Sequence, residues 1–364
     1  MTDEVEFLEE DKPTADEARD AESLALDEPT ADEARDEESL ALIEAFLGQH
    51  GAPVEGTDLD REAEGLPEGH RSGFAALIGR PNAGKSTLVN ALVGQKIAIV
   101  SSKPQTTRSR LLGIVTRPDY QLLLVDTPGI HKNPAFRLNR RMIEQAVAAI
   151  PDADVILFLV DLTTTPREED MYIATLLRQK AARRPVLLVG NKCDRVPGAE
   201  ATARLEAYHA LLPESARVPP ISALEGSALD VLLDAIVARL PEGPRYYPNT
   251  QITDQTERHI AAELIREAVL NLTRQEVPHA SAVLIEEFEE RENGITYIAA
   301  TIWVERDSQK PILIGKGGEK LKRIGSAARA ELERFIGGQV YLDLWVKVKP
   351  KWRDDPARLR ELEL

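Results

Sequence analysis

Four short apolar runs alternate with polar and glycine-rich segments in the middle of the chain. They cover residues 74–78, 122–125, 186–190 and 218–221. An uninterrupted apolar run of this length is typical of a strand that is buried on both faces, as in a parallel sheet covered by helices. A helix is expected after the first run, because Leu88, Ala91 and Leu92 recur on one helical face. The pattern predicts a doubly wound α/β sheet over residues 71–243.

The pattern changes after a short linker, residues 244–253. Asp254-Gln255-Thr256-Glu257 predicts a capped helix start, and apolar positions then recur at helical spacing up to Leu272. Two strands are expected next, joined by an Asn-Gly pair that is typical of a hairpin turn. They cover residues 282–288 and 295–305.

The last part of this region combines a helix with an alternating strand. The helix is expected over residues 319–335, and in the strand Leu342, Leu344 and Val346 face away from Tyr341 and Trp345. These elements predict an α+β domain over residues 254–353, followed by a C-terminal tail, residues 354–364.

The acidity of the chain belongs to its N-terminal end. The net charge is −16, and residues 1–70 contain 24 acidic and 4 basic residues, which leaves 37 acidic and 41 basic residues elsewhere. A 16-residue block repeats over residues 11–26 and 27–42 with two differences. We expect disorder here, because so acidic a segment with few aromatic residues cannot bury a core. A solubilising role is the simpler interpretation, and mimicry of RNA at a basic surface is the alternative.

The first apolar run leads into a glycine-rich loop with the sequence Gly79-Arg80-Pro81-Asn82-Ala83-Gly84-Lys85-Ser86. Strand, loop and helix in this order form a phosphate cradle, in which backbone N–H groups and the helix dipole face phosphate oxygens. In such a cradle Lys85 reaches the β- and γ-phosphates, and the Ser86 hydroxyl can ligate Mg²⁺. A chance glycine-rich turn is disfavoured by this context.

Two later runs also end in polar motifs. Asp126-Thr127-Pro128-Gly129 places a carboxylate at the ligand edge of the predicted sheet, where it can hold Mg²⁺ through water. The N–H of Gly129 can then sense a γ-phosphate.

Asn191-Lys192-Cys193-Asp194 follows another run and predicts the choice of base. The Asp194 carboxylate can accept hydrogen bonds from N1–H and N2–H of guanine, whereas adenine offers neither donor. GTP is therefore expected over ATP. Ser222-Ala223 can support the base from its other side, although this pair alone carries little information.

In this order the motifs resemble those of small GTPases. Residues 104–108, Pro-Gln-Thr-Thr-Arg, are similar to the first switch of the Era family of bacterial ribosome-assembly GTPases. The resemblance implies that Thr107 closes on Mg²⁺, with Thr106 as the competing position. It also implies a catalytic set of Lys85, Thr107 and Gly129.

Two positions of the predicted site carry specific expectations. Ile130 stands where Ras-type enzymes carry the Gln that positions the attacking water, so intrinsic hydrolysis should be slow and open to stimulation by a partner. Asn82 resembles the K⁺ ligand of cation-stimulated relatives, and the alternative is that it only tolerates a left-handed backbone.

The expected ligands are GTP or GDP and Mg²⁺, with K⁺ as a further candidate. The metal ligands are expected to be Ser86, Thr107 and Asp126. The residues expected to contact the nucleotide are Gly79, Arg80, Pro81, Asn82, Ala83, Gly84, Lys85, Ser86, Thr87, Asp126, Thr127, Pro128, Gly129, Ile130, Asn191, Lys192, Cys193, Asp194, Ser222 and Ala223.

A Gly-x-x-Gly loop in the second region predicts nucleic-acid binding. It lies at residues 315–318, and residues 310–353 contain eleven Lys or Arg against four acidic residues. With its neighbouring elements the loop resembles that of a type II KH domain, which clamps about four nucleotides of a single strand. An excess of cations suits phosphate binding. The expected RNA contacts are Ile314, Gly315, Lys316, Gly317, Gly318, Lys320, Lys322 and Arg323.

The Era family pairs these two domains in this order. The resemblance therefore implies binding near the 3′ end of 16S ribosomal RNA and a role in 30S subunit assembly. It implies no DNA partner, a monomer, and a cytoplasmic protein with peripheral association at the membrane. The single Cys cannot form an internal disulfide, and no apolar stretch is long enough to span a bilayer.

Two other classes of function remain open at this point. The chain can be an RNA-binding assembly factor whose nucleotide is only a structural ligand. It can also be a GTPase whose KH-like domain docks a protein. Intact Lys85, Ser86, Thr107 and Asp126 disfavour the first alternative, and the basic flank of the Gly-x-x-Gly loop disfavours the second.

Overall fold

The computed structural model describes residues 66–131, 136–274 and 276–364, which all belong to one compact unit. The expected disorder of the acidic segment and its repeat concern residues 1–65 and lie outside the described residues. The domain boundaries given above likewise stay predictions.

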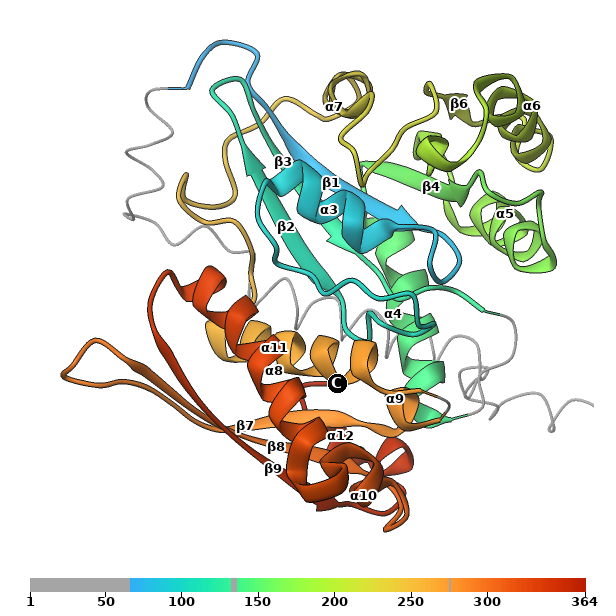
Figure 1. Cartoon of the computed structure of the whole chain (residues 1–364). Coiled ribbons are helices and arrows are strands. Elements are labelled where there is room, and N and C mark those ends of the chain that lie inside the picture. The colour runs from blue at the N-terminus through green and yellow to red at the C-terminus, as the bar shows by residue number, and fades with distance from the viewer. Residues whose placement is uncertain (1–65, 132–135, 275) are drawn as a thin grey trace, which may run out of the picture. The chain divides into compact units, whose positions relative to one another are not determined.

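A six-stranded sheet dominates the first half (Figure 1). Only its edge pair, β2 and β3, is antiparallel, and the other neighbours are parallel. The strands in spatial order are β2 (Leu111–Thr116), β3 (Tyr120–Asp126), β1 (Arg71–Ile78), β4 (Val155–Asp161), β5 (Val186–Asn191) and β6 (Ala216–Arg217).

Helices cover both faces of this sheet, which explains why its central strands are almost continuously apolar. One apolar cluster gathers Leu88 of α3 (Lys85–Val93) and Ile236 of α7 (Leu229–Val237). The opposite cluster gathers side chains such as Ile150, Ile173 and Tyr208. They come from α4 (Arg137–Asp152), α5 (Glu168–Lys180) and α6 (Gly198–His209). The doubly wound prediction is confirmed.

The strand expected over residues 218–221 is wrong. β6 ends at Arg217, and the next residues include Pro219 and Pro220, which have no N–H to donate to a ladder. The chain nevertheless follows the edge of β5, because the N–H of Ile221 donates to the carbonyl of Gly190 at 2.8 Å. With the bond from the N–H of Cys193 to the carbonyl of Ile221 at 3.1 Å, this brings Ser222 to the ligand edge of the sheet.

The capped start expected at Asp254 is also wrong. The N-cap of α8 (Glu257–Leu272) is Thr256, whose side chain accepts from the N–H of His259 at 3.2 Å. Asp254 instead accepts the N–H of Leu112 on β2 at 3.1 Å. An open sheet edge presents unpaired N–H donors. The hydrogen bond between Asp254 and Leu112 therefore replaces the expected cap at the start of the helix.

The second half is a three-stranded sheet with helices on one face. β7 (Ala282–Glu290) is antiparallel to β8 (Thr296–Val304), and β8 is parallel to β9 (Val340–Val348). α8 and α11 (Glu319–Ile336) pack on the sheet through one apolar cluster. Two short elements, α10 (Gln309–Ile314) and the turn η2 (Lys316–Gly318), lead into α11, and α9 (Val277–Ala280) precedes β7. The predicted α+β KH fold is confirmed.

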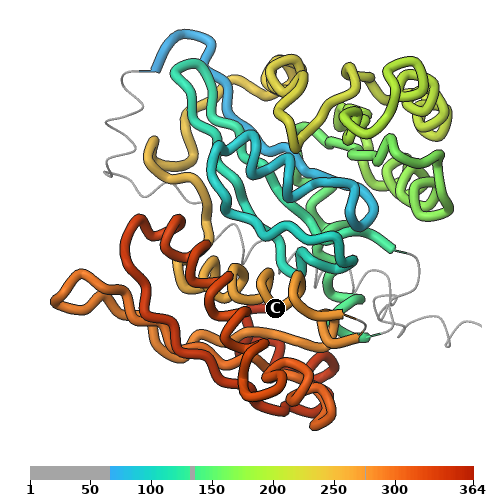
Figure 2. Tube along the Cα trace, viewed as in Figure 1, coloured from blue at the N-terminus to red at the C-terminus, as the bar shows by residue number. Residues whose placement is uncertain are grey.

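The segment expected as a C-terminal tail is folded. After η3 (Trp352–Asp354) it forms α12 (Pro356–Glu361), shown in red in Figure 2. Leu359 is buried in a cluster with Trp303, Trp352 and Leu138 of α4. The end of the chain therefore packs between the second sheet and the first domain.

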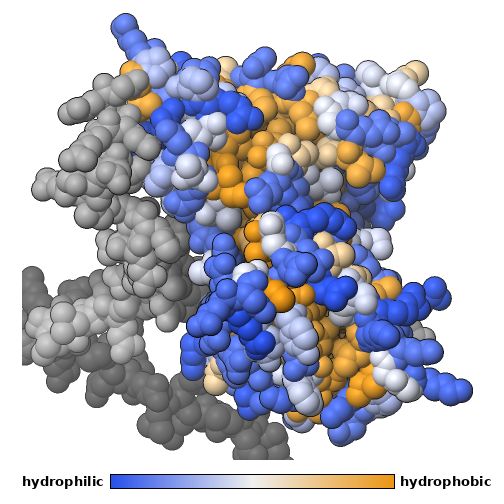
Figure 3. All heavy atoms as spheres, turned by 60° about the vertical axis from the view of Figure 1, so that its left-hand side comes forward, coloured by the Kyte–Doolittle hydropathy of each residue, from blue (hydrophilic) through white to orange (hydrophobic). Residues whose placement is uncertain are grey.

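The described surface is mainly hydrophilic on the face drawn in Figure 3, with apolar atoms in strips between charged side chains. Within the described ranges, no helix combines the length and the apolarity that spanning a bilayer requires.

Candidate functional site

The loop between β1 and α3 encloses the ammonium group of Lys85. The Lys85 Nζ donates to the carbonyls of Gly79 at 3.0 Å and Arg80 at 3.1 Å, and the residue is 6% exposed. Gly84 allows this wrap, because its φ of 100° lies in the left-handed region. A positive charge thus lies under a ring of backbone groups, at the start of a helix.

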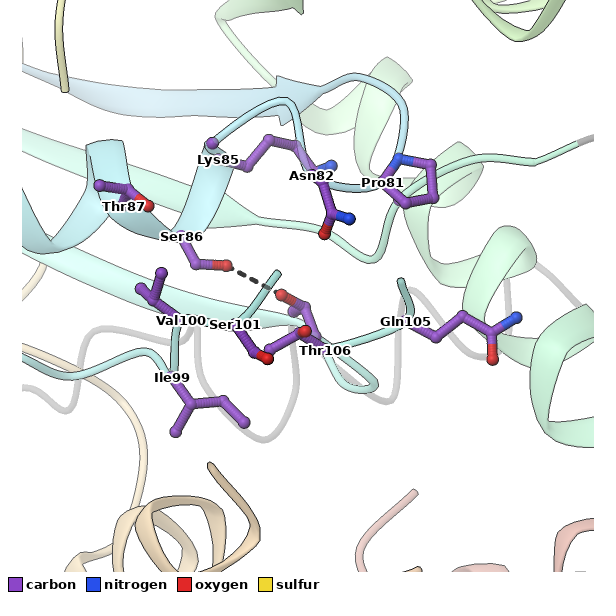
Figure 4. A pocket seen from close by; sticks show the side chains of 13 residues that line it. Pro81, Asn82, Lys85, Ser86, Thr87, Ile99, Val100, Ser101, Gln105 and Thr106 are labelled. Atoms are coloured by element: carbon purple, nitrogen blue, oxygen red, sulfur yellow. Dashed lines mark hydrogen bonds between the residues drawn. The ribbon is translucent and has the colours of Figure 1, made fainter. Parts of the chain in front are cut away.

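Three oxygen-bearing side chains converge beside this loop. The Ser86 hydroxyl lies 2.8 Å from the hydroxyl of Thr107, the bond drawn dashed in Figure 4, and donates to Asp126 Oδ2 at 2.6 Å. The competing residue, Thr106, turns its own hydroxyl to the carbonyl of Lys103 at 2.6 Å. The structure therefore brings Thr107, and not Thr106, to Ser86.

Burial shifts the pKa values of both charged groups in this cluster. Burial lowers the pKa of Lys85 to about 8, although the nearby Asp126 carboxylate opposes the change. Burial likewise raises the pKa of Asp126 to about 6, against the influence of Lys85 and of the Ser86 hydrogen bond. Each charge is incompletely compensated, which suits an anion at Lys85 and a cation at Asp126.

The segment after Asp126 lies directly against the loop. The N–H of Ile130 donates to the carbonyl of Gly79 at 3.3 Å, and a Cβ on Gly129 would meet backbone atoms of Pro81 at 2.6 Å. Only glycine permits this approach. The Ile130 side chain is fully buried in the core, so it cannot orient a water molecule.

The second motif forms the far end of the site. Asn191 bridges two segments: its Nδ2 donates to the carbonyl of Ala83 at 2.9 Å, and its Oδ1 accepts the N–H of Ala223 at 3.0 Å. The Ser222 hydroxyl donates to Asp194 Oδ1 at 2.6 Å. The Asp194 side chain is 8% exposed. Its carboxylate is therefore held in a fixed position at the ligand edge of the sheet.

Sequence reasoning missed Asp161. It ends β4 and accepts the Lys192 ammonium at 2.8 Å, while Arg80 lies 3.6 Å away. Lys192 also donates to the carbonyl of Asn82 at 2.6 Å. The signal was present, since an acidic residue ends a buried strand here as Asp126 does on β3. Cys193, which was expected to contact the nucleotide, is half-buried at the edge of the core.

Asn82 has the left-handed backbone that one of its two interpretations requires, and its side chain reaches a neighbouring segment. Its φ is 62°, in the left-handed region, and its Nδ2 donates to the carbonyl of Ser102 at 2.9 Å. A side-chain amide next to a backbone carbonyl provides two oxygens after rotation of the amide.

The Gly-x-x-Gly loop is formed by the end of α10 and the turn η2. Gly315 has a φ of 75°, and a Cβ there would meet the backbone N of Lys320 at 2.9 Å. Gly317 also has a positive φ, 60°, but its Cβ position is open. Lys316, Lys322 and Arg323 are exposed, and they form no ion pair with any described residue.

A groove adjoins this loop along α11 and β9, which sequence reasoning did not identify. Its apolar floor is suited to base faces, and its rim carries cations. It is lined by Gly318, Leu321, Lys322, Arg329, Tyr341 and Leu344.

We expect Gly84→Ala to weaken nucleotide binding by about tenfold or more. The new Cβ would lie 2.2 Å from Asn191 Nδ2, and Asn191 cannot move without losing its bonds to Ala83 and Ala223. Nucleotide affinity measured by calorimetry checks this.

Gly94→Ala is the matched control. Gly94 ends the same helix with a φ of 80°, and nothing lies within 4 Å of its Cβ position. Both variants place a Cβ on a residue with a positive φ, and only Gly84→Ala adds the contact with Asn191, so equal affinities would contradict the proposed clash.

Family comparisons agree with both halves of this description. Residues 74–192 match the family of 50S ribosome-binding GTPases, and residues 276–353 match the KH domain family. GTPase Era of Heliobacterium modesticaldum is 48% identical over 290 residues, which cover 80% of this chain and 96% of the relative.

Solved structures extend the agreement to the fold. One is Era in complex with MgGDPNP and nucleotides 1506–1542 of 16S ribosomal RNA, at 41% identity and a TM-score of 0.76. Another is a tyrosine-to-alanine variant of Aquifex aeolicus Era bound to GDP·AlF4⁻, at 40% identity and a TM-score of 0.76. Each match covers 80% of this chain and 98% of the other. The buried lysine lies in a phosphate cradle with a carboxylate beside it, and a KH domain follows in the sequence. This chain is a GTPase of the Era family.

Proposed function

We propose that this GTPase binds 16S ribosomal RNA near its 3′ end and acts in the assembly of the 30S subunit. The observation that carries the proposal is the presence, in one compact unit, of a phosphate cradle and an unpaired basic Gly-x-x-Gly loop. The relative that was solved with MgGDPNP and 16S RNA has the same two domains and matches over 98% of its length.

The metal end of the site fits Mg²⁺ with Ser86, Thr107 and Asp126 as the residues that hold it. Asp126 Oδ1 is buried and has no hydrogen-bond partner, which leaves one carboxylate oxygen for a hydrated cation. The hydroxyls of Ser86 and Thr107 lie together on the same side. Bound there, Mg²⁺ neutralises charge on the phosphates during transfer.

Lys85 and Gly129 are proposed to act on the γ-phosphate. The Lys85 ammonium stabilises negative charge that spreads over the phosphate oxygens, and the N–H of Gly129 donates to one of them. Because Ile130 is buried, the attacking water takes its position from backbone groups and from the phosphate itself. Because no side chain of the described residues orients the attacking water, we expect the intrinsic rate of GTP hydrolysis to be slow.

K⁺ is proposed as a further ligand at Asn82. The Asn82 amide and the carbonyl of Ser102 already face each other, so a cation can take the place of the amide hydrogen between two oxygens. Such a cation would lie beside the transferred phosphate and add positive charge there.

The RNA is proposed to contact Ile314, Gly315, Lys316, Gly317, Gly318, Lys320, Lys322 and Arg323. Unpaired cations favour a polyanion over a docked protein at this loop, which disfavours the alternative of a protein-binding KH-like domain. The RNA partner implies a cytoplasmic site of action, and peripheral association with the membrane stays an expectation of the family resemblance.

Nucleotide capture should depend on pH through Lys85. The group is charged below its pKa of about 8, so affinity for GTP should fall by up to about tenfold per unit as pH rises above that value. Lys85→Arg keeps its charge across this range and should flatten the profile. Affinity measured between about pH 7 and about pH 9.5 tests this; parallel profiles for the two proteins would count against it.

Asp194→Asn should change the preferred base. An amide offers a donor in place of an acceptor, so GTP affinity should fall by about 10²-fold or more, while affinity for XTP rises. Competition binding with the two nucleotides provides the measurement. An unchanged preference for GTP would remove the assignment of Asp194.

Hydrolysis should be faster in K⁺ than in Na⁺ if Asn82 is a ligand. Asn82→Gly keeps the left-handed backbone but has no side-chain oxygen, so it should lose the difference between the two salts. Turnover in matched chloride salts decides the matter, and equal rates for the parent protein in both salts would leave Asn82 with a conformational role only.

Gly317→Asp should abolish RNA binding while the fold is kept. The Cβ position is open and aspartate tolerates a φ of 60°, but a carboxylate would face the phosphates. Lys316→Ala should be milder and reduce the salt slope by about 0.7. The measurements are affinity for a single strand from the 16S 3′ end at several salt concentrations, and GTP turnover with that RNA. Parent-like binding by Gly317→Asp would refute the RNA-binding proposal.

A further inference from the structure

Two buried arginines bracket Thr107. Arg266 of α8, 2% exposed, donates from Nη2 to the carbonyl of Thr106. Arg108, 4% exposed, reaches into the second domain and donates to the carbonyl of Ser281 at 2.7 Å. The backbone just before Thr107 and the side chain just after it are therefore both fixed by the KH domain.

Arg266 is itself oriented by a carboxylate on its own helix. Its Nε donates to Glu263 Oε1 at 2.7 Å, and its Nη2 donates to Glu263 Oε2 at 2.5 Å. Burial would raise the pKa of Glu263, but the charge and the hydrogen bonds of Arg266 outweigh it and lower that pKa. The pair stays ionised, and Glu263 fixes the orientation in which Nη2 of the guanidinium reaches the carbonyl of Thr106.

Other side chains of α8 also bind the chain segment that leads to Thr107. Glu267 Oε1 accepts the N–H of Val100 at 2.8 Å, and one turn later Asn271 Oδ1 accepts the Ser101 hydroxyl at 3.0 Å. The Ile99 side chain belongs to the apolar core of the KH domain. These contacts involve residues 99–108. We name this stretch the switch segment.

We propose that Arg266 is a positioning residue for the metal end of the GTPase site. By holding the carbonyl of Thr106, it sets the place of the next residue, whose hydroxyl meets Ser86 at 2.8 Å. A metal ligand displaced by a fraction of an ångström loses much of its effect. The KH domain thus supplies part of the support for the proposed metal site, although the pocket beside Ser86 and Thr107 is lined by residues of the first domain. The inference rests on the proposed role of Thr107.

The experiment measures GTP hydrolysis by the full chain as a function of Mg²⁺ concentration. Arg266→Ala should raise the Mg²⁺ concentration for half-maximal activity by about tenfold, with turnover approaching the parent value at saturating Mg²⁺. GDP affinity should be unchanged, because γ-phosphate and metal together order a switch segment. Arg266→Lys keeps one charged donor without the fork and should fall between the two.

Arg258→Ala is the control for the loss of a guanidinium from the same helix, at an exposed position. Arg258 lies on the same helix and donates to the carbonyl of Glu286 at 2.7 Å, inside the KH domain. It should leave the Mg²⁺ dependence unchanged. Thr107→Ala is the reference for a lost ligand and should shift the Mg²⁺ dependence at least as far as Arg266→Ala.

The outcomes separate the inference from the assignment on which it rests. If Thr107→Ala shifts the Mg²⁺ dependence and neither Arg266 variant does, Arg266 has no positioning role. If Arg266→Ala and Arg258→Ala lower turnover, GDP affinity and thermal stability alike, the effect is structural and the inference is overturned. If Thr107→Ala leaves the Mg²⁺ dependence unchanged, the assignment of Thr107 fails, and this inference fails with it.

Discussion

A buried ammonium group sets the conditions for the rest of this site. Lys85 is held by two carbonyls under its loop, and parallel pairing of β1 and β3 places Asp126 opposite Leu77, just before that loop. Taking both charges out of water is costly, and the pKa values of about 8 and about 6 report how little each is compensated. The site therefore favours charged ligands, and their binding relieves the cost.

The same edge collects polar groups from the ends of three strands and from the segment that follows β6. Asp126 ends β3, Asp161 ends β4, Asn191 ends β5, and Ser222 follows the edge of β5 without belonging to a strand. Their hydrogen bonds to Ser86, Lys192, Ala83 and Asp194 tie the phosphate end, the loop and the base-binding motif into one structure. For this reason, one added methyl group at Gly84 is expected to affect the base-binding motif as well as the loop.

Much of the fold could be predicted from the sequence, because buried parallel strands and the phosphate cradle leave strong local signals. One error came where a distant partner outweighed a local one, and another came from two prolines inside the expected strand. Asp254 is taken by β2, and Pro219 and Pro220 prevent a strand whose apolar pattern was otherwise suitable. Asp161 was missed because its partner, Lys192, is thirty-one positions away. The hydrogen bond from Arg266 to the carbonyl of Thr106 joins residues that are 160 positions apart, and no local pattern indicates it.

The packing around Arg108 gives the chain a built-in optical probe. Its guanidinium lies 5.4 Å from the centre of the Trp352 ring, whose indole N–H donates to Ala280 at 2.9 Å in a fully buried setting. Trp303 is equally buried, but its ring lies beneath Lys349 and Arg358, outside the switch segment, and Trp345 is 59% exposed. Indole emission responds to a nearby charge and to water, so the emission of Trp352 should change when the switch segment leaves the KH domain, without any attached dye.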